Sequence, residues 1–382
     1  KIKENTLMDT PNNLFLIHFG QLEDPRLDRK KLHSLHDIIA ITICAVIAGA
    51  DGWAEIALFG RSKEDWLRTF LKLPNGIPSH DTFGRFFSLL DPVAFQQCFI
   101  NWVQAVHESV QGVVAIDGKT VRRSHDRGKG KKAIHIVGAW ATENGIALGQ
   151  KKVNTKSNEI TAIPELIKSL QLKGCLVTID AMGCQREIAQ VIGEAGADYL
   201  LAVKGNQEAL AEDVEQEFKQ AQGDGFAHMD HQYFETVEKD HGRIETRQYW
   251  YTHDIGGLGT LERWPNLAGM ALCRATRTVN GESSVEDRYF ITSCTHNDVE
   301  KIAGAIRAHW RIENSLHWVL DIAFNEDQSR IRLGYADENL AVVRRLALNA
   351  IKASTSKKGG VKAKRLQAAW DNDYLKEILM AI

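Results

Sequence analysis

Two aspartates occupy the same place relative to short runs of β-branched residues. Asp117 ends the run VVAID and Asp180 ends LVTID, and a glycine follows each within a few residues. An aspartate at the carboxyl end of a central strand projects at the sheet edge where α/β domains bind ligands. Two carboxylates held close together repel each other unless a proton or a divalent cation neutralises them. Either residue alone would be explained as a turn or helix cap, but the pair predicts a site for Mg2+ or Mn2+, which prefer oxygen ligands.

A third acid is expected from HWRIENSLHWVLDIAFNED, residues 309–327, which otherwise has the pattern of a buried helix. On a helical wheel of about 100° per residue, Glu313 falls at the edge of the apolar stripe, with His317 one turn further on. Asp321 falls on the opposite side of the wheel and is expected in solvent, and the helix is expected to end near Glu326. Glu313 is therefore the predicted third metal ligand. The alternative is a surface glutamate paired with a neighbouring Arg or His.

Basic residues are concentrated directly after the first of these aspartates. Seven lysines and arginines lie between Lys119 and Lys132, among them Arg122 and Arg123, against a single acid. Lys204 is expected beside the same edge of the sheet. Each basic segment could be an ordinary solvated loop, but basic side chains next to paired carboxylates favour a polyanionic substrate. The combination predicts an enzyme acting on phosphodiesters, in which two metal ions about 3.5–4 Å apart activate the attacking oxygen and stabilise the leaving oxygen.

The composition is that of an ordinary globular protein. The chain has 382 residues, 44% of them hydrophobic and 25% charged, which is long enough for two or three domains. A formal net charge of -2 excludes a uniformly basic coat but not local basic patches. Six scattered cysteines contain no C-x2-C pair, which argues against a zinc ribbon or a dithiol redox site. Reduced, buried thiols in a cytosolic protein are expected instead.

No membrane segment or secretory leader is expected. The opening KIKENTLMDTPNNLF lacks an apolar core of the length that a leader requires. The longest apolar run, IIAITICAVIAGA at residues 38–50, is shorter than the roughly 20 residues that span a bilayer. It is predicted to form a buried helix.

The order of predicted elements indicates an α/β core between helical segments. Before residue 106 the pattern is helical, and PSHDTFGRFFSLLDP is predicted either as the second helix of a helix-turn-helix-like unit or as a plain packing helix. From residue 112 the expected order is three strands, helix, strand, helix and strand, which favours a mixed sheet whose first three strands form a meander. An acidic helix and three strand-like stretches follow, and then two long helical patterns.

These elements divide the chain into four expected parts. The parts are a helical N-terminal domain that binds DNA (1–105), an α/β catalytic core (106–205 with 300–352), a β-rich insertion (206–299) and a basic C-terminal tail (353–382).

Several motifs in this order resemble the DDE transposases of bacterial insertion sequences, and most closely the ISAs family of H-repeat-associated proteins. The motifs are AIDGKTVRRS, VTIDAMGCQ, DYLLAVKGNQ, DHGRIETR and HWRIENSLHWVLDIAFNED, preceded by DPRLDRKKLHSLHDII and PSHDTFGRFF. The resemblance covers nearly the whole chain. It implies a ribonuclease-H-like α/β core with a mixed sheet, a β-rich insertion between the second and third acids, and an all-helical N-terminal domain.

The resemblance also assigns roles to residues. The catalytic and metal-binding acids would be Asp117, Asp180 and Glu313, which are separated by 63 and 133 positions. In related transposases the third acid belongs to a Tyr-Arg-Glu-Lys signature, whereas here Ile306, His309 and Leu320 stand at the Tyr, Arg and Lys positions.

Phosphate contacts would come instead from Arg311, His317 and Lys119. Residues of the insertion, including Trp264, would hold the transposon end or an extruded base, because an aromatic ring stacks on an unstacked base. The expected DNA-binding residues are Lys119, Arg122, Arg123, Lys204, Asn206, His241, Arg243, Arg247, Trp264, His309, Arg311 and His317.

The implied reaction is cleavage at the ends of a mobile element followed by strand transfer into target DNA, without a covalent protein–DNA intermediate. Mg2+ would be the cofactor, with Mn2+ as a substitute. The partners would be double-stranded DNA and a second copy of the chain, in the nucleoid of a bacterial cytoplasm. Three alternatives stay open at this point: a ribonuclease-H-like nuclease without strand transfer, a domesticated DNA-binding protein, and a small-molecule metalloenzyme.

Overall fold

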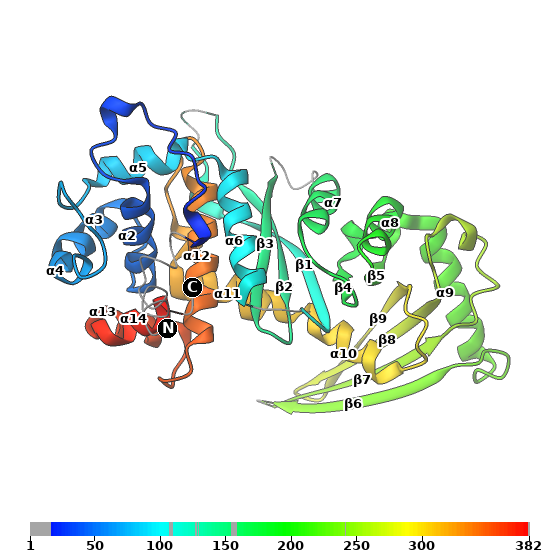
Figure 1. Ribbon diagram of the computed structural model, residues 1–382. Coiled ribbons are helices and arrows are strands. Elements are labelled where there is room, and N and C mark those ends of the chain that lie inside the picture. Colours follow the sequence, from blue (N-terminus) through cyan, green and yellow to red (C-terminus); the bar gives the residue numbers. More distant parts are fainter. Residues whose placement is uncertain are drawn as a thin grey trace, which may run out of the picture.

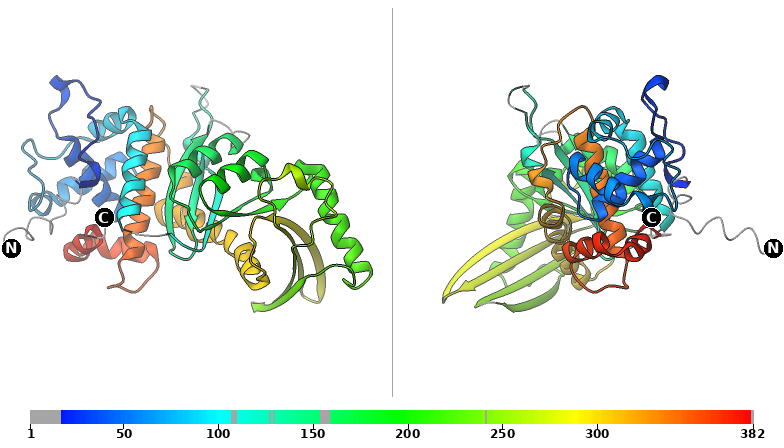
Figure 2. Two further views of the ribbon diagram at one scale, coloured as in Figure 1. Left: turned by 45° about the vertical axis from the view of Figure 1, so that its right-hand side comes forward. Right: turned by 90° about the vertical axis from the view of Figure 1, so that its left-hand side faces the viewer.

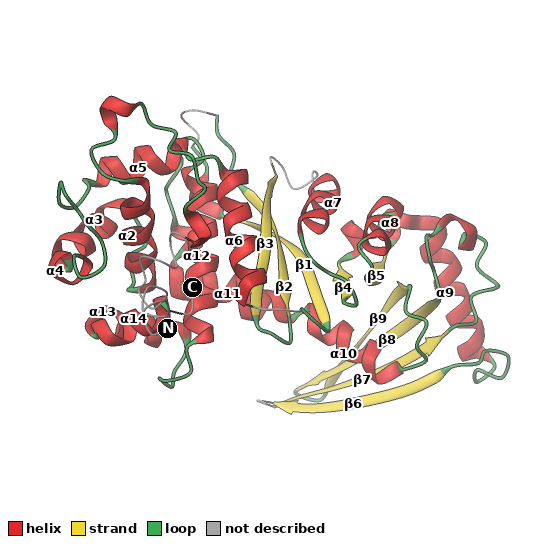
Figure 3. Cartoon of the chain, in the orientation of Figure 1, coloured by secondary structure: helices red, strands yellow, loops and turns green. Residues whose placement is uncertain are grey.

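A single mixed sheet runs from the middle of the molecule to one end, and helices gather at the other end (Figure 1 and Figure 3). The computed structural model describes residues 17–106, 110–126, 128, 130–153, 159–240 and 242–380.

The first five strands form one part of the sheet. They are β1 (Val113–Thr120), β2 (His135–Ala141), β3 (Ile146–Val153), β4 (Leu176–Ile179) and β5 (Asp198–Val203). Their order across the sheet is β3-β2-β1-β4-β5. Neighbours are antiparallel from β3 to β1, and β1, β4 and β5 are parallel. This arrangement confirms the predicted ribonuclease-H-like core, a meander followed by two crossovers.

The insertion extends the same sheet. After α9 (Glu208–Gly223), four strands follow: β6 (Gln232–Asp240), β7 (Arg243–Thr252), β8 (Gly269–Val279) and β9 (Glu282–Thr292). The last of them, β9, pairs antiparallel with β5, so nine strands form one continuous sheet. In both views of Figure 2 the strands of the insertion project as an arm from the rest of the molecule.

Only three strand-like stretches were expected in the insertion, and the difference lies in TVEKDHGRIETRQYWYT. This stretch is a hairpin rather than one strand, because β6 ends and β7 begins within it. Gly242 in the turn has a φ of +76°, a left-handed conformation that glycine adopts without strain.

Helices cover both faces of the sheet. On one face α7 (Glu159–Ser169) and α8 (Arg186–Glu194) pack on residues such as Val114 and Val177. On the other face α10 (Val299–His309) packs on residues such as Val113. Because alternate side chains of a strand point to opposite faces, Asp117 and Lys119 lie on the α10 side together with Val113.

The helical end of the molecule is built from both ends of the chain. Its N-terminal helices are α2 (Leu35–Ile47), α3 (Trp53–Ser62), α4 (Glu64–Leu67), α5 (His80–Leu89) and α6 (Pro92–Val106). The later helices are α11 (Trp318–Phe324), α12 (Ala336–Ala353), α13 (Val361–Trp370) and α14 (Asn372–Leu379). Helix α12 contacts α2, α5, α6 and β3, so the helical region and the sheet share one hydrophobic core.

The segment expected to be a basic tail contains a buried cation. Arg365 of α13 is buried and donates hydrogen bonds to the backbone carbonyls of Val46 and Ala50 and to the carboxylate of Asp51. These bonds fasten α13 to the end of α2. Lys352, at the end of α12, lies over the ring of Trp140 with its Nζ 4.3 Å from the ring centroid.

The apolar run 38–50 lies mostly within α2, whose side chains are buried in protein. None of the described helices combines the length and the apolar character that crossing a membrane requires. All six cysteines are buried and none forms a disulfide.

Candidate metal centre

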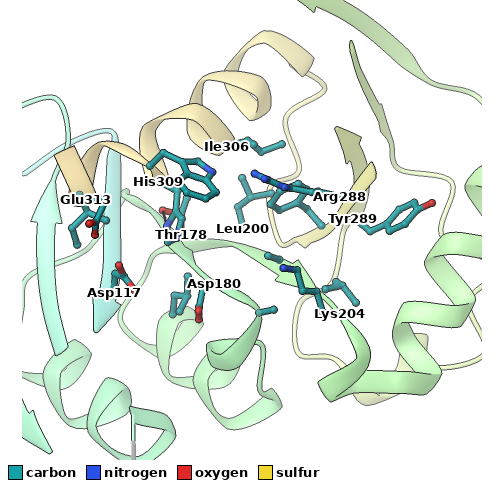
Figure 4. A pocket seen from close by; sticks show the side chains of 17 residues that line it. Asp117, Thr178, Asp180, Leu200, Lys204, Arg288, Tyr289, Ile306, His309 and Glu313 are labelled. Atoms are coloured by element: carbon teal, nitrogen blue, oxygen red, sulfur yellow. Dashed lines mark hydrogen bonds between the residues drawn. The ribbon is translucent and has the colours of Figure 1, made fainter. Parts of the chain in front are cut away.

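The first two predicted acids lie side by side because of the register of two parallel strands. Ile116 of β1 is paired with Ile179 of β4, so Asp117 and Asp180 follow at adjacent positions. Both side chains line one cavity of about 550 Å³ together with Glu313 (Figure 4). The three acids that are far apart in the sequence therefore share one cavity wall.

Glu313 comes from an irregular turn of helix that follows α10. Residues Glu313–His317 form a π-helix, a wider turn than an α-helix and one that is frequent at functional sites. The Nδ1 atom of His317 lies 3.0 Å from Oε2 of Glu313 and 3.7 Å from Oδ2 of Asp117. One ligand atom from each of these residues lies within 4.8 Å of the others. The closest group of possible metal ligands is thus Asp117, Glu313 and His317.

The carboxylate of Asp180 is held in place by backbone groups of the residues that follow it. Its Oδ1 accepts hydrogen bonds from the backbone nitrogens of Met182 at 3.1 Å and Gly183 at 3.3 Å. The carboxylate thereby caps a short 3-10 helix, Ala181–Gly183. Asp180 is therefore a helix cap, which was the alternative explanation for this residue. It also lines the cavity.

The electrostatics of the group favour a cation. Burial raises the pKa of Asp117, an effect that the charge of His317 offsets in part and the neighbouring Asp180 increases. The hydrogen bond with His317 lowers the pKa of Glu313. Two carboxylates and an imidazole nitrogen at these distances fit a divalent metal ion, whose charge would relieve the repulsion between the acids.

Lys119 is not available to a substrate, which corrects its predicted role in DNA binding. Its side chain is buried, and its Nζ lies 2.7 Å from Oδ1 of Asp321 and 3.0 Å from Oδ1 of Asp327. The same contact corrects the prediction that Asp321 lies in solvent. The wheel treated residues 309–327 as one regular α-helix, whereas the π-helix changes its phase and β1 lies beside the supposed solvent face.

Glu326 lies deepest in this charge network. It is fully buried, with Oε1 3.2 Å from Nη1 of Arg345 and 3.9 Å from Nη1 of Arg344, and with Oε2 4.0 Å from Nζ of Lys119. Burial raises its pKa, but the charges of Arg345, Arg344, Lys119 and His317 outweigh that effect and lower it. We call Lys119, Asp321, Glu326, Asp327, Arg344 and Arg345 the buried charge network. It ties β1 to α11 and α12.

Five other residues predicted to bind DNA are exposed, and one of them, Lys204, lines the cavity. Arg122, with 83% of its side chain exposed, pairs with Asp327 at 3.2 Å. Asn206 donates a hydrogen bond to the carbonyl of Ala181 at 2.6 Å and so supports the loop that follows Asp180. The remaining exposed residues of this set are Arg123, Lys204 and Arg311.

His309 and His317 were predicted to lie on a DNA-binding surface, but neither is exposed on a surface of the protein. His317 is 3% exposed and contacts the acids, so it is not free to bind phosphate. His309 lines the cavity, with its Nδ1 3.1 Å from Oγ1 of Thr178, and burial lowers its pKa. A neutral imidazole in this position offers a hydrogen bond to a substrate without adding charge.

The residues expected from the insertion separate into two groups. Arg243 and Arg247 line a second cavity of about 460 Å³ on the α10 side of the arm, and Arg247 pairs with Glu238 at 3.0 Å. Trp264 is 4% exposed and packs in the hydrophobic core, which corrects its predicted role in stacking on a base. His241 lies outside the described residues.

Sequence reasoning missed two residues that line both cavities, Trp310 and Arg288. The ring of Trp310 is 53% exposed, and Cζ of Arg288 lies 5.0 Å from its centroid. Trp310 stands only three residues before Glu313, so its spacing was a usable signal. Arg288 reaches the cavity because β9 pairs with β5, and no local sequence pattern predicts this pairing.

Two known families match the chain, by the descriptions DDE_Tnp_1-associated over residues 16–103 and Transposase DDE domain over residues 108–350. Putative transposase YncI of Escherichia coli O157:H7 is 45% identical over 95% of this chain and 94% of its own length. H repeat-associated putative transposase YhhI of Escherichia coli (strain K12) is 40% identical over 95% of this chain and 96% of its own length. A solved structure of a piggyBac transposase synaptic complex with hairpin DNA has a TM-score of 0.45 at 11% identity, covering 97% of this chain and 81% of that one.

Gly118 is predicted to tolerate no side chain. A Cβ at this position would lie 2.5 Å from both Oε1 of Glu159 and Nε2 of His135, which are buried and hydrogen-bonded to each other. Gly118→Ala should therefore lower the free energy of unfolding by about 1–3 kcal/mol in urea denaturation. Gly138→Ala is the matched control on the neighbouring strand, because its Cβ would meet only Leu316 at 3.7 Å. Equal effects of the two substitutions would contradict this account.

Asp117 is predicted to destabilise the metal-free protein at neutral pH. Because burial raises the pKa of Asp117 in the folded state, ionisation there costs stability above that pKa. As the pH falls through the folded pKa and then the unfolded one, the cost disappears. Asp117→Asn should therefore unfold at a higher urea concentration than the wild type at pH 7, and at the same concentration once both states are protonated. A lower midpoint for the variant at pH 7 would refute the prediction.

Proposed function

Since this chain belongs to the family of transposases with a DDE domain, we propose that it cuts DNA at the ends of a mobile element and joins the freed ends to target DNA. Its relatives at 40–45% identity over nearly the whole chain include an H repeat-associated transposase, which confirms the resemblance found in the motifs. The chain is therefore a DNA transposase. The individual steps, the metal and the roles of the residues below are our proposal.

The observation that carries the proposal is the cavity shared by Asp117, Asp180 and Glu313. In this proposal the three carboxylates hold Mg2+, with Mn2+ as a substitute. The bound metal would supply activation of the attacking oxygen and stabilisation of the leaving oxygen. The protein would contribute the two paired strands that hold the aspartates rigidly, and the exclusion of water from the buried side of the cavity.

The substrate would be bound by the second cavity, which adjoins the first through Arg288, Ile306 and Trp310. Arginines dominate its wall, namely Arg243, Arg247, Arg277, Arg288 and Arg307. Several of them pair with glutamates in the free protein, for example Arg288 with Glu286 at 2.8 Å. We propose that a DNA strand follows this wall and that its phosphates replace the glutamates as partners of the arginines.

Trp310 would take the role proposed from the sequence for Trp264. Its ring is exposed at the junction of the two cavities, next to Arg288. An exposed indole beside a guanidinium suits an unpaired base, which stacks on the ring while the cation meets the adjacent phosphate.

The parts of the chain would share the work as the sequence predicts. In this proposal residues 1–105 contribute to DNA binding, 106–205 with 300–352 form the catalytic core, 206–299 hold the element end, and 353–382 complete the helical end of the molecule. Two copies would act on paired ends, in the nucleoid of a bacterial cytoplasm.

A strand-transfer assay tests the proposed activity. The substrate is a pre-cleaved DNA end from the sequence that borders the gene, with a target plasmid and Mn2+. The wild-type chain should give joined product, and Asp117→Asn should give neither cleavage nor joining while it still binds DNA. The control is Asp65→Asn, which removes an exposed carboxylate from α4 and should remain active.

The outcomes separate the alternatives. Cleavage without any joined product would favour a nuclease with the same fold. DNA binding without cleavage by the wild type would favour a domesticated DNA-binding protein. Binding that does not weaken with salt would argue against a phosphate-binding wall.

Binding measurements test the role of Trp310. Loss of a base-stacking ring costs about 1–3 kcal/mol, so Trp310→Ala should weaken binding to a DNA end with an unpaired nucleotide by about tenfold or more. Fluorescence anisotropy measures the affinity. Trp370→Ala is the control, because this ring is 77% exposed at the far end of α13 and should not affect binding. An equal loss for a fully paired duplex would contradict stacking.

A further inference from the structure

We propose that His317 is a direct ligand of the metal ion in this site, through its Nδ1 atom. The three acids of the family signature do not include this residue. The inference rests on the metal site of the proposed function, but it concerns which atoms of this chain form that site.

The position of the imidazole is the first argument. Nδ1 of His317 lies between two carboxylates, 3.0 Å from Glu313 and 3.7 Å from Asp117. These three ligand atoms all lie within 4.8 Å of one another, whereas Asp180 uses one oxygen to cap the following turn. An ion that binds both Asp117 and Glu313 would therefore meet Nδ1 as its nearest additional donor.

The burial of the ring is the second argument. His317 is 3% exposed, and within the part of the chain that the structure describes its Nε2 has no hydrogen-bond partner. A buried polar atom without a partner is costly, so it calls for an explanation. If Nδ1 binds a metal through its lone pair, the proton must be on Nε2, on the side of the ring away from the metal.

The surroundings of His317 suit a protonated Nε2. Oε2 of Glu326 is also buried without a hydrogen-bond partner among the described residues. His317 is close enough for its charge to contribute to the lowered pKa of Glu326. Metal-bound histidines usually have a carboxylate or carbonyl near their second nitrogen, which orients the ring and strengthens it as a ligand. Glu326 would take this role in the metal-bound protein, because its Oε2 and Nε2 of His317 are both without a partner among the described residues and are not bonded to each other.

An imidazole ligand changes which metals the site prefers. Mg2+ favours oxygen ligands almost exclusively, whereas transition metals accept imidazole nitrogen readily. A site of two or three carboxylates and one histidine should therefore bind Mn2+ more tightly than Mg2+. Replacing His317 should reduce that difference.

The competing role for His317 is that of a hydrogen-bond donor that only positions Glu313. Both roles place Nδ1 near Oε2 of Glu313, so geometry in the metal-free protein does not separate them. They differ in whether the nitrogen stays bonded to a proton or binds the metal.

Pulsed electron paramagnetic resonance of Mn2+ bound to the full chain separates the two roles without any substitution. A directly bound imidazole gives a nitrogen modulation of the Mn2+ signal, and this modulation changes from the 14N to the 15N pattern in protein labelled with 15N-histidine. We expect that change. A Mn2+ signal with no histidine nitrogen modulation would overturn the proposal.

Two variants identify the histidine. His317→Asn keeps an amide that can donate to Glu313 but removes the imidazole, so the nitrogen modulation should disappear and Mn2+ affinity should fall by at least about tenfold in calorimetric titration. His309→Asn is the matched control, because this histidine lines the cavity that the three acids share, and it should retain the modulation. Loss of the modulation in His309→Asn, with retention in His317→Asn, would assign the ligand to His309 and refute the inference.

The measurement also distinguishes this inference from the proposed function. If Asp117→Asn abolishes Mn2+ binding and strand transfer while His317→Asn retains the modulation, the inference fails and the transposase activity stands. If the wild type shows the modulation but no joined product, His317 is a ligand and strand transfer is what fails.

Discussion

The parallel pairing of β1 with β4 is the contact on which the rest of the site depends. The register that sets Ile116 beside Ile179 brings Asp117 and Asp180 to adjacent positions at one edge of the sheet. A parallel pair requires a long crossover, here β2, β3 and α7, and α7 also covers one face of the sheet. The cost of the arrangement is the burial of the Asp117 carboxylate beside that of Asp180, and the charges of His317 and His309 reduce that cost.

The buried charge network gives the third acid a defined position. Glu313 sits on a short π-helix that would have little rigidity alone, but α11 directly after it is fastened to β1 through Asp321 and Lys119. Glu326 continues the connection to α12 through Arg345. The network therefore fixes the distance between the strand that carries Asp117 and the helix that carries Glu313. A buried ion pair is weak evidence for stability, and here its geometric role explains its presence better.

Local patterns were sufficient to predict a mixed sheet that begins with a meander, but not that the strands of the insertion continue the same sheet. Asp180 directly follows the end of β4 as predicted, whereas Asp117 lies within β1, which continues to Thr120, and Glu313 stands at the edge of a helical stripe. The predictions were wrong where the burial or the contacts of a side chain depend on residues far away in the sequence. Lys119 and Asp321 find each other across 202 positions of sequence, and the burial of Trp264 depends on packing that no periodicity encodes. His317 was noticed as a neighbour of Glu313, but only its burial shows that it faces the acids instead of a substrate.

The continuous sheet has a mechanical consequence. Because residues 289–292 at the end of β9 are paired with residues 200–203 of β5, the arm is joined directly to the strands that carry the aspartates. A force applied to DNA held on the arm would be transmitted through backbone hydrogen bonds to β5, and from there to the loop that carries Asp180, which Asn206 supports from the end of β5. The β6–β7 and β8–β9 tips carry no such load. Changes in the length of those hairpins would alter the reach of the arm along DNA and leave the alignment of the acids intact.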